Sequence, residues 1–448
     1  MQNIKEVTKT KLNIEISHSL TIKEIENWYL SGIKNDLRIG LEYERLSLDI
    51  DGLKNAQYEK LEQIIRSFCS LASWEIDFDN ETIIGAHNQD GTSISLEPGC
   101  QLEISIAPKK DILAIDLELN KIINTLDEIA KKLGVVFVGY GISPVSCVDD
   151  IKVLKKERYK VMTKYLPECE YGELSLKMMR KTAGMQFNVD YKNKKDAYLK
   201  LKFFNLIMPF ASGLCANSPF EKSKLQDKKS QRAHVWRYTG RERCNLFYKK
   251  VFDGFFKINN VFKNYIDSIL NVPMIFIERQ NNIIEINGKI TFREFMENGF
   301  LNYKATMNDY ILHQSLCFPD VRLKKYIEIR NHDSSDSAMA LAMCAFYKGL
   351  AQSDVEKNLK IFKYLKINDI EKHNKNIIEQ GLNYKVRNGI CGWDVVDELF
   401  EIAKNHLNSS QRNYLESINQ MLKARKTKAD LISDYEIKNA KDLVEFLY

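Results

Sequence analysis

Pairs of acidic side chains two residues apart are the part of this sequence best suited to chemistry. Glu42 and Glu44 alternate with Leu41 and Tyr43, so a strand here places both carboxylates on one face and the apolar side chains on the other. Two carboxylates this close repel each other unless a cation lies between them. A solvated strand face is the ordinary alternative for any one such segment.

Three more segments repeat this period of two. They read SLEPGCQLEISIAP, GMQFNVDY and VRLKKYIEIR, and each opposes polar side chains to apolar ones. The polar residues that would share a face within their own segment are Gln101, Glu103 and Ser105, then Gln186, Asn188 and Asp190, then Arg322, Glu328 and Arg330. Glu97 precedes a Pro98-Gly99 break, which leaves its side undecided.

The residue types on these four faces point to one shared site. They are acids, amides and arginines, with hardly any alternation of Lys and Glu. Hard oxygen ligands without a His or Cys cluster favour Mg²⁺ or Mn²⁺ over zinc. Arginines beside them suit phosphate or carboxylate groups, which a guanidinium fork matches. Together the segments predict a metal, nucleotide and carboxylate site on a concave sheet.

Several nucleotide and hydrolase motifs are absent. The chain has no GxxxxGK[ST] loop, no GxGxxG after a strand, no set of protein-kinase motifs and no GxSxG elbow. An ATP site would therefore be built from strand carboxylates.

The spacing and types of the residues outside these strands predict the other secondary-structure elements. Residues 112–133, 336–365 and 395–448 have helical spacing with many Lys and Glu, and 217–243 is polar and basic. We expect an α+β fold with one main sheet and a helical C-terminal third.

Overall composition excludes several classes of protein. The 448 residues are 44% hydrophobic with a net charge of +6, which is globular and only mildly basic. The basic run Lys222–Arg243 lacks interleaved aromatics or a groove-reading helix, so we expect no nucleic-acid partner. No apolar leader or membrane-length stretch stands out, and the nine cysteines form no CxxC pair. We therefore expect a cytoplasmic protein with reduced thiols.

An ordered set of motifs resembles the plant-type glutamate–cysteine ligases, which are also found in proteobacteria. The resemblance spans residues 36–448 and rests on GLEYERL (40–46), SLEPGCQLEISIAP (95–108), GMQFNVD (184–190), LCANSPF (214–220), QRAHVW (231–236), VPMIF (272–276), TFREF (291–295) and FPDVRLKKYIEIR (318–330). Each motif is short, but their order along the chain is specific.

The resemblance implies a fold and a reaction. The fold is a six-stranded, mostly antiparallel curved sheet of the glutamine-synthetase and guanido-kinase type, with helices packed behind it. An N-terminal segment, 1–35, would precede a single ligase domain, 36–448. The reaction joins the γ-carboxyl of L-glutamate to the amine of L-cysteine through γ-glutamyl phosphate, using ATP and Mg²⁺ or Mn²⁺, as the first step of glutathione biosynthesis. Only small-molecule substrates are expected as partners, with no membrane, and the chain would be a monomer or homodimer.

The resemblance also implies roles for particular residues. The metal ligands would be Glu42, Glu44, Glu97, Glu103, Gln186 and Glu328. The glutamate side would be lined by Lys181, Lys224, Arg232 and Trp236. Arg322 and Arg330 would face phosphates or carboxylates and act in catalysis with Glu42 and Glu44.

One departure leaves the amine acceptor open. After Trp236 the family has an acidic run, whereas this chain reads WRYTG over 236–240. The alternative is a paralogue that joins glutamate, or another amino acid, to a different amine. A catalytically inactive binding subunit is a further alternative, disfavoured because an inactive copy has no physical reason to keep clustered like charges.

Overall fold

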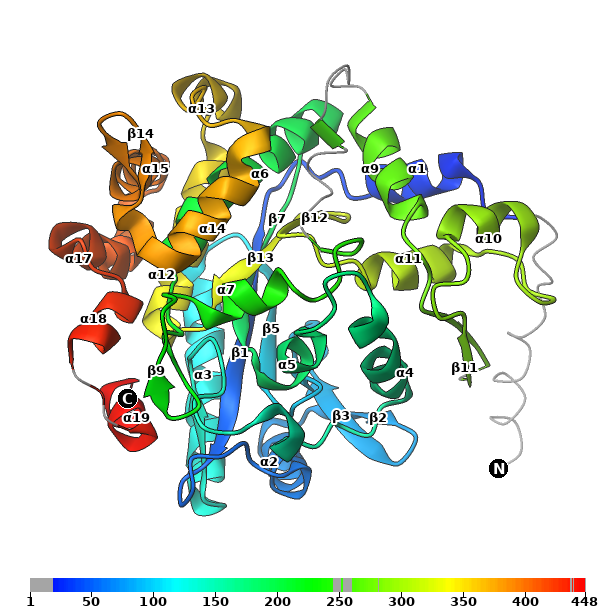
Figure 1. Ribbon diagram of the computed structural model, residues 1–448, viewed down its shortest axis with the longest axis horizontal. Helices are drawn as coiled ribbons and strands as arrows, with labels where there is room; N and C mark the ends of the chain where they lie inside the picture. The colour runs from blue at the N-terminus through cyan, green and yellow to red at the C-terminus, as the bar shows by residue number, and fades with distance from the viewer. Residues whose placement is uncertain are drawn as a thin grey trace.

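The largest sheet of the molecule is antiparallel and supports the site (Figure 1). The structure is a computed structural model and describes residues 19–244, 251–252, 260–280, 282–435, 437 and 439–447. Within these residues the sheet has nine strands in the order β12-β13-β7-β1-β5-β4-β3-β2, with β6 paired to β1. Their bounds are β1 Ile39–Asp49, β2 Glu75–Asp79, β3 Thr82–His87, β4 Ser93–Leu96, β5 Leu102–Lys109, β6 Val135–Val138, β7 Gly184–Val189, β12 Val321–Leu323 and β13 Ile327–Asp333.

Strand β1 lies at the centre and sets the register of the site. Glu42 is opposite Ser105 of β5 and Gln186 of β7, and Glu44 is opposite Glu103 of β5. The alternating apolar residues enter the core, where the Tyr43 hydroxyl donates to the carbonyl of Ser335 at 2.6 Å. The two faces of β1 are therefore divided as the sequence predicts.

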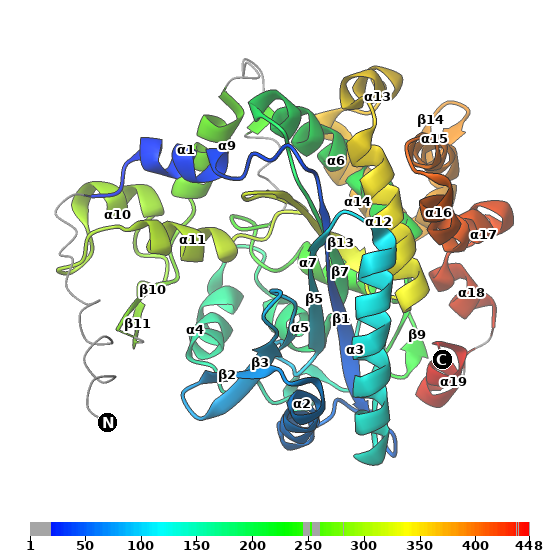
Figure 2. The same ribbon diagram turned by 180° about the vertical axis from the view of Figure 1, so that it is seen from behind.

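Long helices cover one face of the sheet (Figure 2). These are α3 (Ile112–Lys132), α6 (Lys194–Leu214) and α12 (Ser337–Gln352). Helix α3 contacts β5 and β6, helix α6 contacts β12 and β13, and helix α12 contacts β1 and β7. Helix α12 is buried along nearly its whole length, as expected for a helix between a sheet and further helices.

Short helices lie over the other face, in front of the sheet in Figure 1. They are α4 (Glu157–Tyr165), α5 (Ser175–Lys181) and α7 (Gln231–Trp236). Helix α7 contacts β13 and α5, which brings its side chains to the polar face of the sheet.

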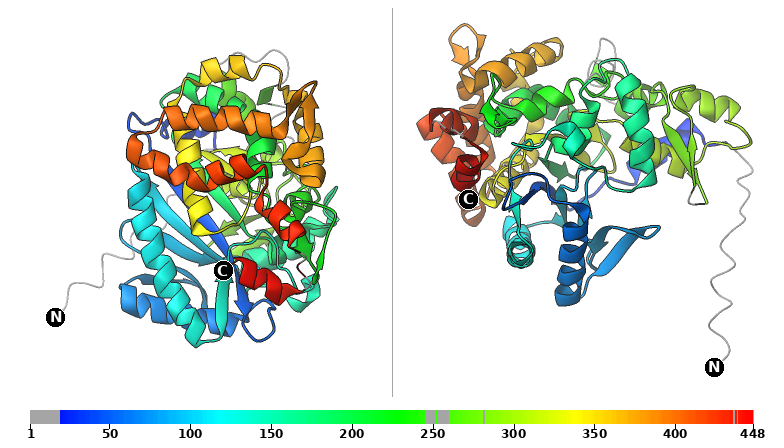
Figure 3. Two further views of the ribbon diagram at one scale, coloured as in Figure 1. Left: turned by 90° about the vertical axis from the view of Figure 1, so that its left-hand side faces the viewer. Right: turned by 60° about the horizontal axis from the view of Figure 1, so that its bottom comes forward.

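The C-terminal helices gather at one end of the molecule, and the hairpin of β10 (Phe276–Arg279) and β11 (Asn282–Glu285) lies at the other (Figure 3). The helices are α13 Val355–Ile361, α14 Ile370–Gln380, α15 Gly392–Asn405, α16 Ser409–Arg412, α17 Glu416–Ala424, α18 Lys428–Asp434 and α19 Ala440–Leu447, with a hairpin of β14 Lys385–Arg387 and β15 Ile390–Cys391 before α15. Beside β10 and β11 lie α1 Ile22–Leu30, α9 Val261–Leu270, α10 Phe292–Asn298 and α11 Met307–Ser315, and α1 contacts α9 and α11.

The predicted fold class is confirmed, with corrections to its parts. The α+β architecture, the antiparallel sheet and the helical C-terminal third are as expected, but the sheet has nine strands rather than six. The segment 321–330 is a hairpin and not one strand, because the chain turns at 324–326. The stretch 217–243 also holds short elements, namely β8 Phe220–Glu221, β9 Lys224–Leu225 and α7. The predicted boundary between an N-terminal segment, 1–35, and the ligase domain stays a prediction. Residues 1–18 of that segment lie outside the residues that the structure describes.

Two expectations about the whole chain can be compared with the structure. All nine cysteines are free thiols. Among the described residues, no helix combines the length and the apolar character that crossing a membrane requires.

Candidate active site

Four carboxylates and the amide of Gln186 are among the side chains that line one cavity of about 270 Å³ on the polar face of the sheet. Glu42 and Glu44 come from β1, Glu103 from β5, Gln186 from β7, and Glu97 from the turn between β4 and β5. The predicted grouping of these five residues is therefore present in the structure.

The turn after β4 decides the side of Glu97, which the strand pattern left open. Cys100 adopts a φ of 63°, a left-handed conformation that non-glycine residues rarely adopt. Its N–H donates to the carbonyl of Glu97 at 2.8 Å, and its own carbonyl accepts from the Ser47 hydroxyl at 2.8 Å. This tight turn brings Glu97 back over the polar face.

Burial and mutual repulsion change the acidity of Glu44, Glu97 and Glu103. Burial raises the pKa of Glu44 to about 7, with a further increase from Glu97 and a decrease from the positive charge of Arg232. Burial, followed by the charges of Glu42 and Glu97, holds the pKa of Glu103 well above its usual range. The pKa of Glu97 is also raised by burial. The cavity thus disfavours its own negative charges.

Hydrogen bonds fix the carboxylates without neutralising them. Glu44 accepts from the Gly184 N–H at 2.5 Å and from Gln186 Nε2 at 3.0 Å. Glu42 accepts from Asn188 Nδ2 at 2.8 Å. All of these donors are uncharged, so these hydrogen bonds do not neutralise the two carboxylates.

Positive side chains reach the same cavity, and two of them were not predicted. Arg330 lines it and donates to Gln186 Oε1 at 2.5 Å. Lys156 and Arg158, at the start of α4, also line it, and their charges lower the pKa of Glu97. The basic run KKERYK at 155–160 was the available signal, but the strand pattern gave no reason to connect it with the sheet.

Glu328 and Arg322 lie on the same sheet but form a separate cluster. Arg322 donates to both oxygens of Glu328, at 2.5 and 3.0 Å, and Arg330 and Lys324 add bonds of 3.0 and 3.2 Å. Burial alone would raise the pKa of Glu328, but the charges of Arg322, Lys324 and Arg330 hold it well below its usual range. A metal-ligand role for Glu328 stays a prediction and would require some of these ion pairs to be exchanged.

Helix α7 places Arg232 and Trp236 beside the cavity. Trp236 lines it, and the Arg232 guanidinium lies 5.6 Å from the Trp236 ring. A Cβ at Gly184 would come within 2.3 Å of Arg232 Nη2, so only glycine allows β7 and this arginine to approach so closely. Nε and Nη1 of Arg232 are buried and find no hydrogen-bond partner among the described residues.

A buried carboxylate at the end of β13 holds the start of α7. Asp333 accepts from the hydroxyl of Ser230, the N-cap of α7, at 2.7 Å. It also accepts from the Ser218 hydroxyl at 2.6 Å and from the Asn217 N–H at 2.8 Å. The Ser218 hydroxyl in turn accepts from the Arg232 N–H at 3.2 Å. Asp333 thereby links the strand that carries Arg330 to the helix that carries Arg232.

Lys181 and Lys224 are not brought to the cavity. Lys181 is fully buried, and its Nζ lies 2.6 Å from Glu221 Oε1. This ion pair offsets the cost of burying both charges, and it directs the lysine away from the acidic group. Lys224 is exposed in the β8–β9 hairpin. Their contacts with a substrate stay predictions.

The donor chemistry of the cavity fits a hard divalent cation. Four carboxylates, of which Glu44 is buried and the other three half-buried, repel one another and gain most from an ion such as Mg²⁺. Among the described residues, however, no group of three or more His, Cys, Asp or Glu residues has an arrangement that could hold a metal ion. The side chains would therefore have to converge when a metal binds.

Solved structures define the class of fold. Glutamate–cysteine ligase from Francisella tularensis, solved in complex with AMP, has a TM-score of 0.57 and 12% identity over 90% of this chain and 85% of its own. A bifunctional glutathione synthetase from Pasteurella multocida has a TM-score of 0.51 and 13% identity over 95% of this chain and 54% of its own. The fold is thus one that amide-forming ligases use.

Sequence comparison gives the family. The model of glutamate-cysteine ligase family 2 (GCS2) matches residues 38–438, and the chain belongs to this family. The chloroplastic glutamate–cysteine ligase of Medicago truncatula is 31% identical over 89% of this chain and 77% of its own length. The chloroplastic glutamate–cysteine ligase B of Oryza sativa subsp. japonica is 29% identical over 96% and 87%.

These names correct one expectation. The cytoplasmic location inferred from the sequence is contradicted by these names, because the similar curated ligases are chloroplastic.

Proposed function

We propose that the chain joins the γ-carboxyl group of L-glutamate to the amine of L-cysteine at the expense of ATP. The observation that carries this proposal is the cavity in which Glu42, Glu44, Glu97 and Glu103 face Arg330, in a chain of the glutamate–cysteine ligase family. In this role the enzyme would catalyse the first step of glutathione biosynthesis.

The acidic cavity is the proposed site for magnesium. Glu42, Glu44, Glu97 and Glu103, with Gln186 beside them, would hold it. Bound there, the metal would neutralise the phosphates of ATP and so favour phosphoryl transfer. Arg330 and the unpredicted Lys156 and Arg158 line the same cavity and would contact phosphate oxygens, which guanidinium and ammonium groups bind well.

Arg232 is proposed to hold a carboxylate of glutamate. The buried Nε and Nη1 of Arg232 find no hydrogen-bond partner among the described residues and need acceptors, and a carboxylate oxygen of glutamate would accept from one of them. Burial lowers the pKa of Arg232, and the negative charges of Glu44 and Asp333 offset this only in part, so a further anion beside the guanidinium would stabilise its charge.

Apolar side chains complete the cavity and would limit water. Met162, Met178, Met179 and Phe318 line it together with Trp236. An acyl phosphate is readily hydrolysed, so a wall of this kind would favour attack by an amine over attack by water.

One experiment tests both the reaction and the acceptor. Purified full-length protein is given ATP, Mg²⁺ and L-glutamate with a panel of amines, and ADP and amide products are followed by mass spectrometry. We expect γ-glutamylcysteine when cysteine is present. An amide formed with another amine, and none with cysteine, would replace this proposal by the paralogue alternative. No ADP with any amine would reject ligase activity.

A further inference from the structure

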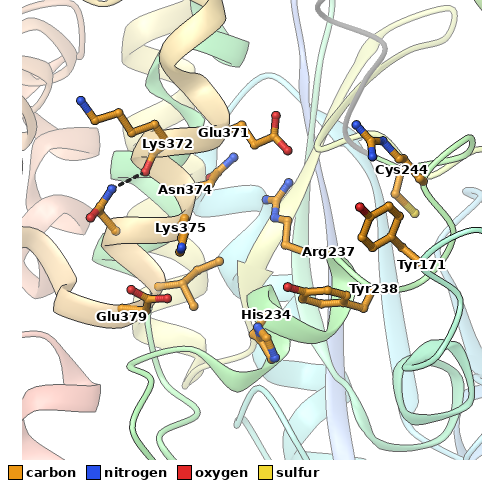
Figure 4. A pocket seen from close by; sticks show the side chains of 13 residues that line it. Tyr171, His234, Arg237, Tyr238, Cys244, Glu371, Lys372, Asn374, Lys375 and Glu379 are labelled. Carbon is orange, nitrogen blue, oxygen red and sulfur yellow. Dashed lines mark hydrogen bonds between the residues drawn. The ribbon is translucent and has the colours of Figure 1, made fainter.

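A second cavity lies behind the end of α7 and is larger than the acidic one. It encloses about 630 Å³ between the residues that follow Trp236 and helix α14 (Figure 4). Trp236 and Phe318, whose rings are 5.7 Å apart, line the acidic cavity, whereas Arg237 and Tyr238 line the second one. The chain at the end of α7 therefore separates the two cavities.

The walls of the second cavity carry charges of both signs. Arg237 and Arg241 project from the α7 side, where Arg237 also pairs with Asp320 at 2.8 Å and Arg241 with Glu170 at 3.4 Å. Glu371 and Glu379 project from α14. Figure 4 shows the Glu371 carboxylate turned toward Arg237 and the Lys372 side chain extended away from it. A purely anionic ligand such as inorganic phosphate would be repelled by the acids of α14, whereas a ligand with both charges could complement both walls.

A buried donor in this cavity has no acceptor. Asn374 is only 4% exposed and lines the cavity, and its Nδ2 finds no hydrogen-bond partner among the described residues. Buried polar groups are nearly always paired in folded proteins. A carboxylate oxygen of a ligand would supply the missing acceptor.

Aromatic rings provide the apolar part of the cavity. The rings of Tyr171 and Tyr238 are 6.1 Å apart, and the His234 ring is 5.0 Å from that of Tyr238. Convergent polar groups on an aromatic lining are typical of small-molecule sites, and this cavity volume suits a ligand larger than a single amino acid.

We propose that this cavity is a binding site for a short zwitterionic peptide. The carboxylate end would accept from Asn374 and Arg241, and the ammonium end would lie at Glu379. The backbone and side chains between them would pack on Tyr171 and Tyr238. This site is separate from the one proposed for ligation, and its occupant need not be a substrate.

Binding of tri-alanine to the full chain, measured by calorimetry, tests the proposal. N-acetyl-tri-alanine and tri-alanine amide each lack one terminal charge. We expect saturable binding of tri-alanine and at least about fivefold weaker binding of either blocked peptide. No saturable binding up to roughly 10 mM, or equal binding of all three peptides, would overturn the proposal.

Variants of residues that line the second cavity test whether tri-alanine binds there and not at the site proposed for ligation. Arg241→Ala should remove the preference for the free carboxylate, and Glu379→Gln the preference for the free amine. Arg387→Ala and Glu285→Gln change exposed residues that do not line the cavity and should leave binding unchanged. Unaltered binding in both cavity variants, or displacement of tri-alanine by glutamate with ATP, would overturn the site. The assay needs no turnover, so its failure is distinct from failure of the ligase proposal.

Discussion

Carboxylates lie in two places on one sheet, and the protein balances their charge in different ways. Glu328 is surrounded by Arg322, Lys324 and Arg330, and its pKa is held well below its usual range against the effect of burial. Glu44 and Glu103, a few strands away, have uncharged donors at short range, and burial raises the pKa of each.

The difference separates a balanced cluster from an unbalanced one. Burying a carboxylate costs free energy unless a cation is close by. At Glu328 that cation is part of the chain, so the cluster is complete without a ligand. In the acidic cavity the balance is incomplete, and the missing charge is the physical reason to expect a cation there.

The largest effect is expected when the balanced cluster loses a cation. Arg322→Met keeps much of the side-chain volume but leaves Glu328 with fewer positive partners, and breaking a buried pair in this way costs about 3–5 kcal/mol of unfolding free energy. Urea unfolding measures it.

The control for this variant is Arg66→Met, which breaks an exposed pair with Glu62. That loss should be about 0.5 kcal/mol or less. Equal losses in the two variants would mean that the Glu328 cluster contributes no more than a surface pair.

The acidic cavity should respond in activity instead. Replacing Glu42 and Glu44 together by Gln preserves shape and removes two charges, and we expect ADP production to fall by about 10³-fold, equivalent to about 4 kcal/mol. Because repulsion is relieved, the unfolding free energy without metal should stay the same or rise. Glu75→Gln, at an exposed side chain, serves as the control. Unchanged activity in the double variant would contradict the metal assignment.

The contrast also explains how much the sequence could predict. Strand alternation is local, so Glu42, Glu44, Glu103 and Gln186 were assigned to one face correctly. Glu97 could not be placed, because a left-handed turn at Cys100 determines its direction.

Contacts between segments that are far apart in the sequence could not be predicted from strand alternation. Arg322 and Glu328 were read as one strand, although the turn at 324–326 makes them cross-strand partners. Lys156 and Arg158 reach the cavity from a helix that packs over the sheet. Lys181 was assigned to substrate binding, yet it forms a buried ion pair with Glu221, 40 residues further along the chain.

A smaller effect is expected in the pH dependence of stability. Burial raises the pKa of Glu44 from 4.5 to about 7, so the folded state binds more protons than the unfolded state in this interval. The group's stabilisation is fully present below about pH 4.5 and is lost as pH rises through about 7, with a change on the order of 3 kcal/mol.

Urea unfolding of the wild type and of Glu44→Gln, compared at pH 5 and pH 8 without metal, isolates this effect. The wild type should lose more stability than the variant as pH rises, and Mg²⁺ should reduce the difference. Parallel pH dependence of the two proteins would show that Glu44 is not disfavoured as an anion.

The smallest effect is expected at Asp333, whose carboxylate accepts hydrogen bonds from two hydroxyl groups and one backbone N–H. Asp333→Asn loses one acceptor of the network at the N-cap of α7 and should let Arg232 shift from the acidic cavity. Since Arg232 is proposed to bind glutamate, we expect KM for glutamate to rise about tenfold, about 1.4 kcal/mol, with kcat changed much less. Ser230→Ala should act in the same direction more weakly, whereas Ser433→Ala, which removes a hydroxyl from α18, should do nothing. A fall in kcat with KM unchanged would mean that Asp333 does not position the glutamate site, and that its carboxylate matters to the sheet alone.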